Sequence, residues 1–295
     1  METNSIQNVA VLGAGSMGQQ IAMLSALGGF TTYLQDINGE SLSKAGQSLE
    51  ARMDDWVKKE KISGEIKQAA FDKLHMTTDL KEAVQSADIV IEAVVEKLDV
   101  KQEVFAELDK LASKEAILAT NSSSIVNSKI AEVTERPDKV VNMHFFFPPL
   151  VMDCVEVVKS DQTSEETANA AVKFCEQLGR TAVLLEKEIY GFIANRLLFA
   201  ISNEALYLYE NGYADFEDID IITKKALGHP LGPFELMDLS GIDVGYYANK
   251  QLYEETGDPK DKPAKSVEEK VKAGNLGRKT GKGWYEYSGN KKVKK

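Results

Sequence analysis

The chain is poor in the residues that build metal sites and disulfide frameworks. It contains two cysteines, Cys154 and Cys175, and three histidines among 295 residues. The cysteines have no metal-binding spacing, and scattered histidines without a Cys-x-x-Cys pair offer nothing from which to assemble a metal centre. We therefore expect no metal cofactor, and the sparse cysteines favour a protein of the reducing cytoplasm.

Basic charge and long apolar runs are also scarce. The formal net charge is −11, which argues against nucleic acid or an anionic membrane as the main partner. No stretch approaches the roughly 18 apolar residues of a membrane-spanning helix, and Met1–Ser5 lacks the character of a secretory signal. Hydrophobic residues at 43% and charged residues at 27% are typical of a globular enzyme. The length favours two domains.

The N-terminal part contains a glycine-rich turn between an expected strand and an expected helix. The apolar segment Asn8–Leu12 runs into Gly13-Ala14-Gly15-Ser16-Met17-Gly18, and a helical pattern covers Gln19–Leu27. In this G-x-G-x-x-G arrangement the glycines permit a tight turn, a close approach of the backbone to a pyrophosphate, and close packing of helix on strand. The helix N-terminus then offers unpaired N–H groups to phosphates.

A carboxylate follows the next expected strand. Thr31–Gln35 ends at Asp36, which is placed to accept both ribose hydroxyls of a dinucleotide and to repel a 2′-phosphate. The motif and the carboxylate together predict a site for NAD rather than NADP. The alternative is a glycine turn that serves packing alone.

Strands and helices continue to alternate after Asp36. Two helices are expected between residues 38 and 74, and further strands at His75–Thr77, Ile89–Ala93, Ile117–Ala119 and Val140–Met143. Alternation of this kind predicts a parallel sheet with right-handed crossovers, whose ligands collect at the carboxyl ends of the strands. From residue 188 the pattern is almost wholly helical, starting with Phe192–Tyr209. We expect a Rossmann-type domain with inserted helices at 1–187 and an all-helical domain at 188–295, with a disordered Lys291–Lys295 tail.

One histidine lies in a tract of aromatic residues. His144 follows the apolar run Val140–Met143 and precedes three phenylalanines, and Glu156 lies among valines in a second apolar run. A buried carboxylate is costly unless it is paired. An imidazole partner would convert that pair into a general base, with the carboxylate holding the tautomer. The alternative is a core histidine and an unrelated strand glutamate.

Several longer motifs follow one another along almost the whole chain. They are Gly13–Gly18, Ala87–Glu96 with Lys101, Thr120–Ser124, Met143–Phe146, Met152 with Val155–Val158, Gly191–Leu198, His229–Pro233 and Gly277–Tyr285. With these motifs in this order the chain resembles the short-chain L-3-hydroxyacyl-CoA dehydrogenases, including the bacterial 3-hydroxybutyryl-CoA dehydrogenases.

The resemblance implies roles for particular residues. His144 matches the family's catalytic base, Glu156 its orienting carboxylate, Ser123 a donor to the substrate oxygen, and Asn195 an amide that polarises the carbonyl. Ser123 also reads as a helix N-cap, and Asn195 as a polar residue at a helix start. The expected contacts with NAD are Gly13, Gly15, Ser16, Met17, Gly18, Asp36, Glu96, Lys101, Asn121 and Ser123. The resemblance also implies a homodimer formed through the helical domain.

Two features bear on the substrate. The family usually has asparagine where this chain has Phe147, which removes an amide near the base and adds an apolar ring. Lys58 and Lys59, on the inserted helices, are candidate contacts for the phosphates of coenzyme A, and a solvated helix face explains them equally well. The leading interpretation is an NAD-dependent L-3-hydroxyacyl-CoA dehydrogenase of short-chain preference. The alternatives are a dehydrogenase of a free 3-hydroxy acid, such as a sugar acid or carnitine, and a non-catalytic NAD-binding protein.

Overall fold

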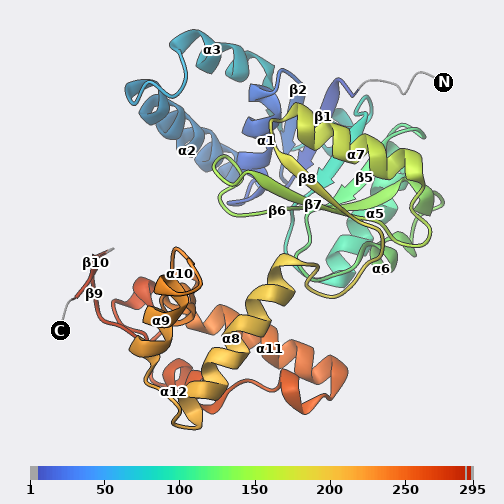
Figure 1. Cartoon of the computed structure of the whole chain (residues 1–295). Coiled ribbons are helices and arrows are strands. Elements are labelled where there is room, and N and C mark those ends of the chain that lie inside the picture. The colour runs from blue at the N-terminus through green and yellow to red at the C-terminus, as the bar shows by residue number, and fades with distance from the viewer. Residues whose placement is uncertain (1–5, 290, 294–295) are drawn as a thin grey trace. The chain divides into compact units, whose positions relative to one another are not determined.

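The chain divides into two compact units, Met1–Ile193 and Ala194–Lys295, in a computed structural model that describes residues 6–289 and 291–293 (Figure 1). The division falls later than the expected boundary at 187/188. The reason is local: Phe192 is fully buried with Val158 and Leu185 of the first unit. The backbone N–H of Ile193 also donates to the Glu156 carboxylate at 2.9 Å.

The first unit is built on one eight-stranded sheet with the order β3-β2-β1-β4-β5-β6-β7-β8. The first six strands run parallel, whereas β7 is antiparallel to β6 and parallel to β8. This topology confirms the predicted α/β fold and departs from it at β7, because the short 146–153 connection returns the chain beside β6. The strands are β1 (Asn8–Leu12), β2 (Thr31–Gln35), β3 (Leu74–Thr77), β4 (Ile89–Glu92), β5 (Ile117–Thr120), β6 (Val140–Phe145), β7 (Cys154–Val158) and β8 (Thr181–Leu185).

Helices cover both faces of this sheet. Alternate residues of β1 enter different cores: Val9 and Val11 face one, and Ala10 and Leu12 face the other. Burial on both faces explains why the strands are almost continuously apolar. The first core includes α1 (Gly18–Leu27), α2 (Gly39–Lys58), α3 (Gly64–Lys73) and α7 (Glu165–Gln177), and the second includes α4 (Leu80–Val84), α5 (Leu98–Leu111) and α6 (Asn127–Ala131).

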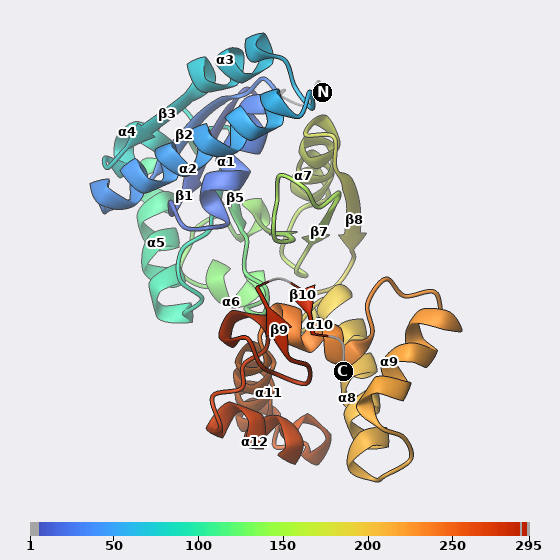
Figure 2. The ribbon, with the colours of Figure 1, turned by 90° about the vertical axis from the view of Figure 1, so that its left-hand side faces the viewer.

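The inserted helices predicted between residues 38 and 74 are α2 and α3, and Figure 2 shows α2 running beside α1. Side-chain caps define where each begins. The Asn38 side chain accepts the Glu40 N–H at 2.8 Å, and the Ser63 hydroxyl accepts the Ile66 N–H at 3.2 Å. Both caps satisfy amide groups that a helix start otherwise leaves unpaired.

The second unit is helical around an aromatic core of Tyr209, Phe216, Phe234 and Trp284. Its helices are α8 (Ala194–Glu210), α9 (Phe216–Lys225), α10 (Pro233–Ser240), α11 (Ile242–Thr256) and α12 (Lys265–Lys272). The expected helix start at Phe192 is wrong, because Phe192 has a left-handed backbone with φ of 51° that no α-helix contains.

The C-terminal segment also differs from expectation. β9 (Tyr287–Ser288) pairs with β10 (Lys291–Lys292), so the predicted disordered tail is wrong for these lysines, and the helical unit contains one short pair of strands. Lys292 Nζ reaches the Glu235 carboxylate at 2.5 Å. Lys294 and Lys295 lie outside the described residues.

Candidate active site

Packing explains two of the three glycines in the glycine-rich turn. Gly13 has φ of 97°, and a Cβ there would lie 2.7 Å from the Ala93 carbonyl oxygen. A Cβ on Gly18 would overlap the Gly13 carbonyl, so both positions need glycine for packing reasons. A Cβ on Gly15 would meet no atom of the chain within 4 Å. Packing within the chain therefore does not explain Gly15.

Unused backbone donors surround Gly15. Ala14 N–H donates to Asp36 Oδ2 at 2.8 Å. Within the described residues, the N–H groups of Gly15, Ser16 and Met17 donate to no protein acceptor. Three consecutive free amides at a helix start form an anion-binding concavity. The NAD contacts expected at these residues stay a prediction.

Asp36 follows β2 at the edge where β1 ends. Its Oδ1 accepts the Asn38 N–H at 2.9 Å, and its Oδ2 accepts the Ala14 N–H, so the carboxylate is held in one orientation. Each oxygen keeps a second lone pair for a ribose hydroxyl. Ile37, the next residue, is 93% exposed and offers an apolar surface beside that carboxylate.

A buried ion pair lies at the ends of β4 and β5. Glu92 is fully buried and Lys101, on α5, is 1% exposed. Glu92 accepts from Lys101 Nζ at 2.7 and 3.0 Å, from the Thr120 hydroxyl at 2.7 Å and from the Val94 N–H at 2.7 Å. Glu92 has no predicted role, although a carboxylate in an apolar strand is the same signal that points to Glu156. Lys101 thus has a structural partner, and its contact with NAD stays a prediction.

Glu96 organises the serine loop that follows β5. Its Oε1 accepts from the Ser122 hydroxyl at 2.5 Å, from the Ser123 N–H at 2.9 Å and from the Ser124 N–H at 3.2 Å. Its Oε2 lies 3.1 Å from Lys101 Nζ. Burial raises the pKa of Glu96, but the Lys101 ammonium and the hydrogen bonds from Ser122 and Ser123 outweigh burial, so the pKa lies below its ordinary value of 4.5.

The loop separates two roles that the sequence left open for Ser123. Neither Ser122 nor Ser123 caps α6, whose N-cap residue is Val126 and has no side-chain cap. The Ser122 hydroxyl oxygen instead accepts the Ile125 N–H at 2.8 Å within the loop. Ser123 is exposed, and within the described residues its hydroxyl has no partner. The side-chain oxygen of Asn121 accepts the Phe145 N–H at 2.9 Å, and this hydrogen bond connects the loop to β6.

His144 and Glu156 face each other directly across β6 and β7. His144 is the penultimate residue of β6 rather than a residue beyond the strand, and it is 6% exposed. Its Nδ1 lies 2.8 Å from Glu156 Oε2. Because a carboxylate only accepts, Nδ1 carries the proton and Nε2 of the neutral ring is left with a lone pair. Within the described residues, Nε2 has no hydrogen-bond partner.

The remaining predicted residues lie elsewhere in the two units. Phe147 is 61% exposed, on the 146–153 connection after β6. Lys58 is the last residue of α2, and Lys59 is its C-cap residue. The Lys59 ammonium lies 2.8 Å from the Asp55 carboxylate. Asn195 is the second residue of α8, in the second unit.

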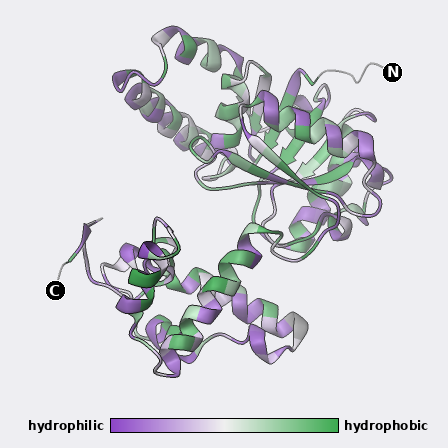
Figure 3. Cartoon of the chain, viewed as in Figure 1, coloured by the Kyte–Doolittle hydropathy of each residue, from purple (hydrophilic) through white to green (hydrophobic). Residues whose placement is uncertain are grey.

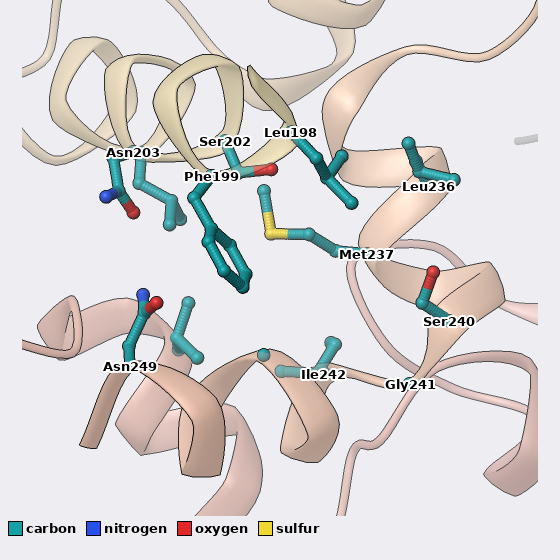
Figure 4. A pocket seen from close by; sticks show the side chains of 13 residues that line it. Leu198, Phe199, Ser202, Asn203, Leu236, Met237, Ser240, Gly241, Ile242 and Asn249 are labelled. Carbon is teal, nitrogen blue, oxygen red and sulfur yellow. The ribbon is translucent and has the colours of Figure 1, made fainter. Parts of the chain in front are cut away.

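The second unit contains an apolar pocket between α8, α10 and α11 (Figure 4). Phe199 from α8 and Met237 from α10 point into it, and Asn203 and Asn249 provide polar groups at its margin. Among the described residues, no group of three histidine, cysteine or acidic side chains could hold a metal ion. Over the same part of the chain, no helix is both long enough and apolar enough to cross a membrane.

Comparison with protein families covers both units. Residues 8–189 match the NAD binding domain of 3-hydroxyacyl-CoA dehydrogenase, and residues 191–287 match its C-terminal domain. The two units are those of a nicotinamide-dependent dehydrogenase. The chain belongs to the 3-hydroxyacyl-CoA dehydrogenase family, and it is an oxidoreductase whose cofactor is NAD.

Individual relatives match over nearly the whole length. The mitochondrial hydroxyacyl-coenzyme A dehydrogenase of Rattus norvegicus is 38% identical, over 96% of this chain and 91% of the rat protein. A probable 3-hydroxybutyryl-CoA dehydrogenase of Bacillus subtilis is 38% identical, over 96% of this chain and 98% of that protein. The crystal structure of (S)-3-hydroxybutyryl-CoA dehydrogenase from Ralstonia eutropha has a TM-score of 0.91 at 38% identity, over 96% of this chain and 100% of that one.

Proposed function

We propose that this enzyme interconverts a short-chain L-3-hydroxyacyl-CoA and its 3-ketoacyl-CoA, with 3-hydroxybutyryl-CoA as the first substrate to test. The observation that carries the proposal is the buried His144–Glu156 pair, which leaves Nε2 open. Oxidising a secondary alcohol requires a base for the hydroxyl proton, and NAD, when bound, supplies the hydride acceptor. The names of the B. subtilis and R. eutropha relatives support the choice of acyl group.

His144 Nε2 takes the hydroxyl proton in the direction of oxidation and returns it in the direction of reduction. Glu156 keeps the proton on Nδ1 and stabilises the imidazolium that forms. The unused Ser123 hydroxyl supports a role as donor to the substrate oxygen, where negative charge develops during reduction. Asn195 has the amide that the same task needs, and its assignment rests on the family motif.

Gly13, Gly15, Ser16, Met17 and Gly18 would hold the NAD pyrophosphate, and Asp36 the adenosine ribose. Glu96, Lys101, Asn121 and Ser123 stay the proposed contacts nearer the nicotinamide, at the edge where β4 and β5 end. Lys58 and Lys59 stay proposed contacts for coenzyme A phosphates, and at Lys59 such a phosphate would compete with Asp55.

Phe147 bears on which acyl group is accepted. The ring is exposed, and Val151 and Met152 on the same connection are also exposed, at 59% and 41%. An apolar surface at this edge favours an acyl chain over the hydroxyl-rich body of a sugar acid. A free hydroxy acid remains the second candidate because Phe147 replaces the family's asparagine.

The substrate is tested by following NADH loss with acetoacetyl-CoA and, in parallel, with free acetoacetate. We expect kcat/KM to be at least about 100-fold higher for the thioester, since binding energy from the coenzyme A portion is used in the transition state. Turnover of only the free acid would contradict the proposal. NADH binding without turnover of either compound would identify a non-catalytic NAD-binding protein.

We propose that the second unit also forms a homodimer. Exposed apolar residues are frequent on α8 and α9 and include Leu197, Ile201, Ile221 and Ile222. Figure 3 shows hydrophobic stretches along both helices. Ile201 of α8 and Ile222 of α9 line the same apolar hollow, and large exposed apolar patches often mark interaction sites. Sedimentation equilibrium should give a molar mass of two chains for the wild type and of one chain for Ile222→Asp. A monomeric wild-type protein would contradict the proposed homodimer.

Both cysteines are free thiols, which supports the proposed cytoplasmic location.

A further inference from the structure

The junction segment before α8 holds an aromatic residue in an unusual backbone conformation. Phe192 has φ of 51° and follows Gly191, whose φ is 74°. Left-handed φ is uncommon outside glycine and is an outlier for a bulky residue. Such conformations persist where the surroundings enforce them, often beside a reacting group. Here the enforcement includes full burial against Val158 and Leu185 and a hydrogen bond from the Phe192 N–H to the Ile189 carbonyl at 3.1 Å.

The left-handed turn directs two groups at the His144–Glu156 pair. The Phe192 ring packs on the His144 ring with centroids 5.6 Å apart and planes at 54°. The next backbone N–H, that of Ile193, donates to Glu156 Oε1 at 2.9 Å, on the oxygen that does not face His144. If α8 began at Phe192, the helical backbone conformation would remove both the ring contact with His144 and the hydrogen bond from Ile193 to Glu156.

A single hydrogen bond does not fix the direction in which Nε2 points. The ring can still tilt about its own side-chain torsions while the Nδ1–Oε2 hydrogen bond is kept, and each further contact on the ring or on the carboxylate narrows that tilt. His144 lies between Phe146, at 4.7 Å between ring centroids, and Phe192. Those two rings limit the imidazole plane, and the Ile193 N–H limits the carboxylate.

We propose that Phe192 is a positioning residue for proton transfer: its strained left-handed conformation is retained because it seats a ring on His144 and sends the Ile193 N–H to Glu156. This rests on the proposed role of His144 as base. Phe192 touches neither substrate nor cofactor in this account, and it acts through His144. A glycine would adopt the same φ without strain and would lose the ring.

The test compares Phe192→Leu and Phe192→Gly in the full-length protein, with Glu60→Gly as control. Leucine keeps apolar volume in the cluster, whereas glycine relieves the strain and removes the side chain. Glu60 is the other described non-glycine residue with left-handed φ, at 56°, and lies in the turn after α2. We expect both Phe192 variants to lower kcat by about 10- to 100-fold, as small misplacements of reacting groups do, with NADH affinity within about twofold. Glu60→Gly should leave kcat unchanged.

A proton NMR measurement separates positioning from simple packing. The chain has three histidines, so the low-field proton shared by His144 and Glu156 can be assigned with few variants. The proposal requires this signal to weaken or vanish in Phe192→Leu together with the fall in kcat. An unchanged kcat, or a lower kcat with the signal intact, would overturn it. If His144→Ala itself keeps its turnover, the proposed function fails instead, whatever the Phe192 variants do.

Discussion

Glu92 and Glu156 are both carboxylates buried in apolar strands of the same sheet, yet the networks around them end differently. The Glu92 carboxylate accepts hydrogen bonds from Lys101, from Thr120 and from the Val94 N–H. Lys101 also forms an ion pair with Glu96. Around Glu156, one oxygen takes a backbone N–H and the other takes His144, whose far nitrogen has no partner within the described residues.

A buried, paired carboxylate can be structural or can belong to a reacting group. Burial and pairing are common to both sites, so neither property identifies a reacting group. What distinguishes them is an unpartnered atom: within the described residues, Nε2 of His144 has no hydrogen-bond partner. The Glu92 network joins the ends of β4 and β5, whereas the proposed role of the His144–Glu156 pair uses the unpartnered Nε2 as a base. Changes at the first should therefore affect stability, and changes at the second should affect turnover.

The largest effect is expected when the unpartnered nitrogen is removed. His144→Ala should lower kcat at least about 100-fold, because general base catalysis contributes roughly 10²–10⁴-fold. NADH affinity, measured by fluorescence titration, should stay within about twofold. His75→Ala is the matched control, because His75 lies on β3 beside Tyr33, and the kcat of this variant should not change. A His144→Ala enzyme with most of its turnover would remove the distinction between the two networks.

Breaking the Glu92 network should instead show in the unfolding equilibrium. Lys101→Met leaves Glu92 buried without its cation, and removing one partner of a buried pair costs about 3–5 kcal/mol. Urea unfolding measures the change in the free energy of unfolding. Lys110→Met, on the exposed face of the same helix, should stay within about 0.5 kcal/mol. Equal stabilities of the two variants would contradict the structural role of Glu92.

A smaller effect is expected from Glu96, which joins the Glu92 network to the serine loop. Its folded-state pKa is lowered, so it stabilises the fold when ionised, above its ordinary pKa of 4.5. That contribution is lost as pH falls through the lowered pKa. The difference in unfolding free energy between wild type and Glu96→Gln should therefore be present at neutral pH and shrink below pH 4.5. A difference that grows on acidification would reverse the sign of this assignment.

Much of the site could be predicted because its residues have local signatures. The glycine turn and Asp36 follow from strand ends and helix starts, and the His144–Glu156 pair follows from polar residues in apolar runs. The burial of Lys101 could not, because a lysine on a helix reads as a surface residue until its partner is placed. Three consecutive serines are equivalent in sequence, so only geometry separates Ser122 from Ser123.

The junction was the least predictable part. An apolar segment with a long helical pattern indicated a helix from Phe192, and no local signal marks a left-handed phenylalanine. Its surroundings come from residues distant in the sequence, namely Val158, Leu185 and the His144–Glu156 pair. The antiparallel return of β7 was missed for a similar reason. The spacing between His144 and Glu156 permits several pairings, and only the register makes them direct neighbours.

The most direct test of the central distinction is kcat for Glu156→Gln. Glutamine has one side-chain oxygen for two donors, the Ile193 N–H and His144 Nδ1, so it cannot hold both or enforce the tautomer that leaves Nε2 free. We predict a fall in kcat of at least about tenfold with NADH affinity unchanged. A kcat within about twofold of wild type would contradict the account, because Glu156 would then be a structural carboxylate like Glu92.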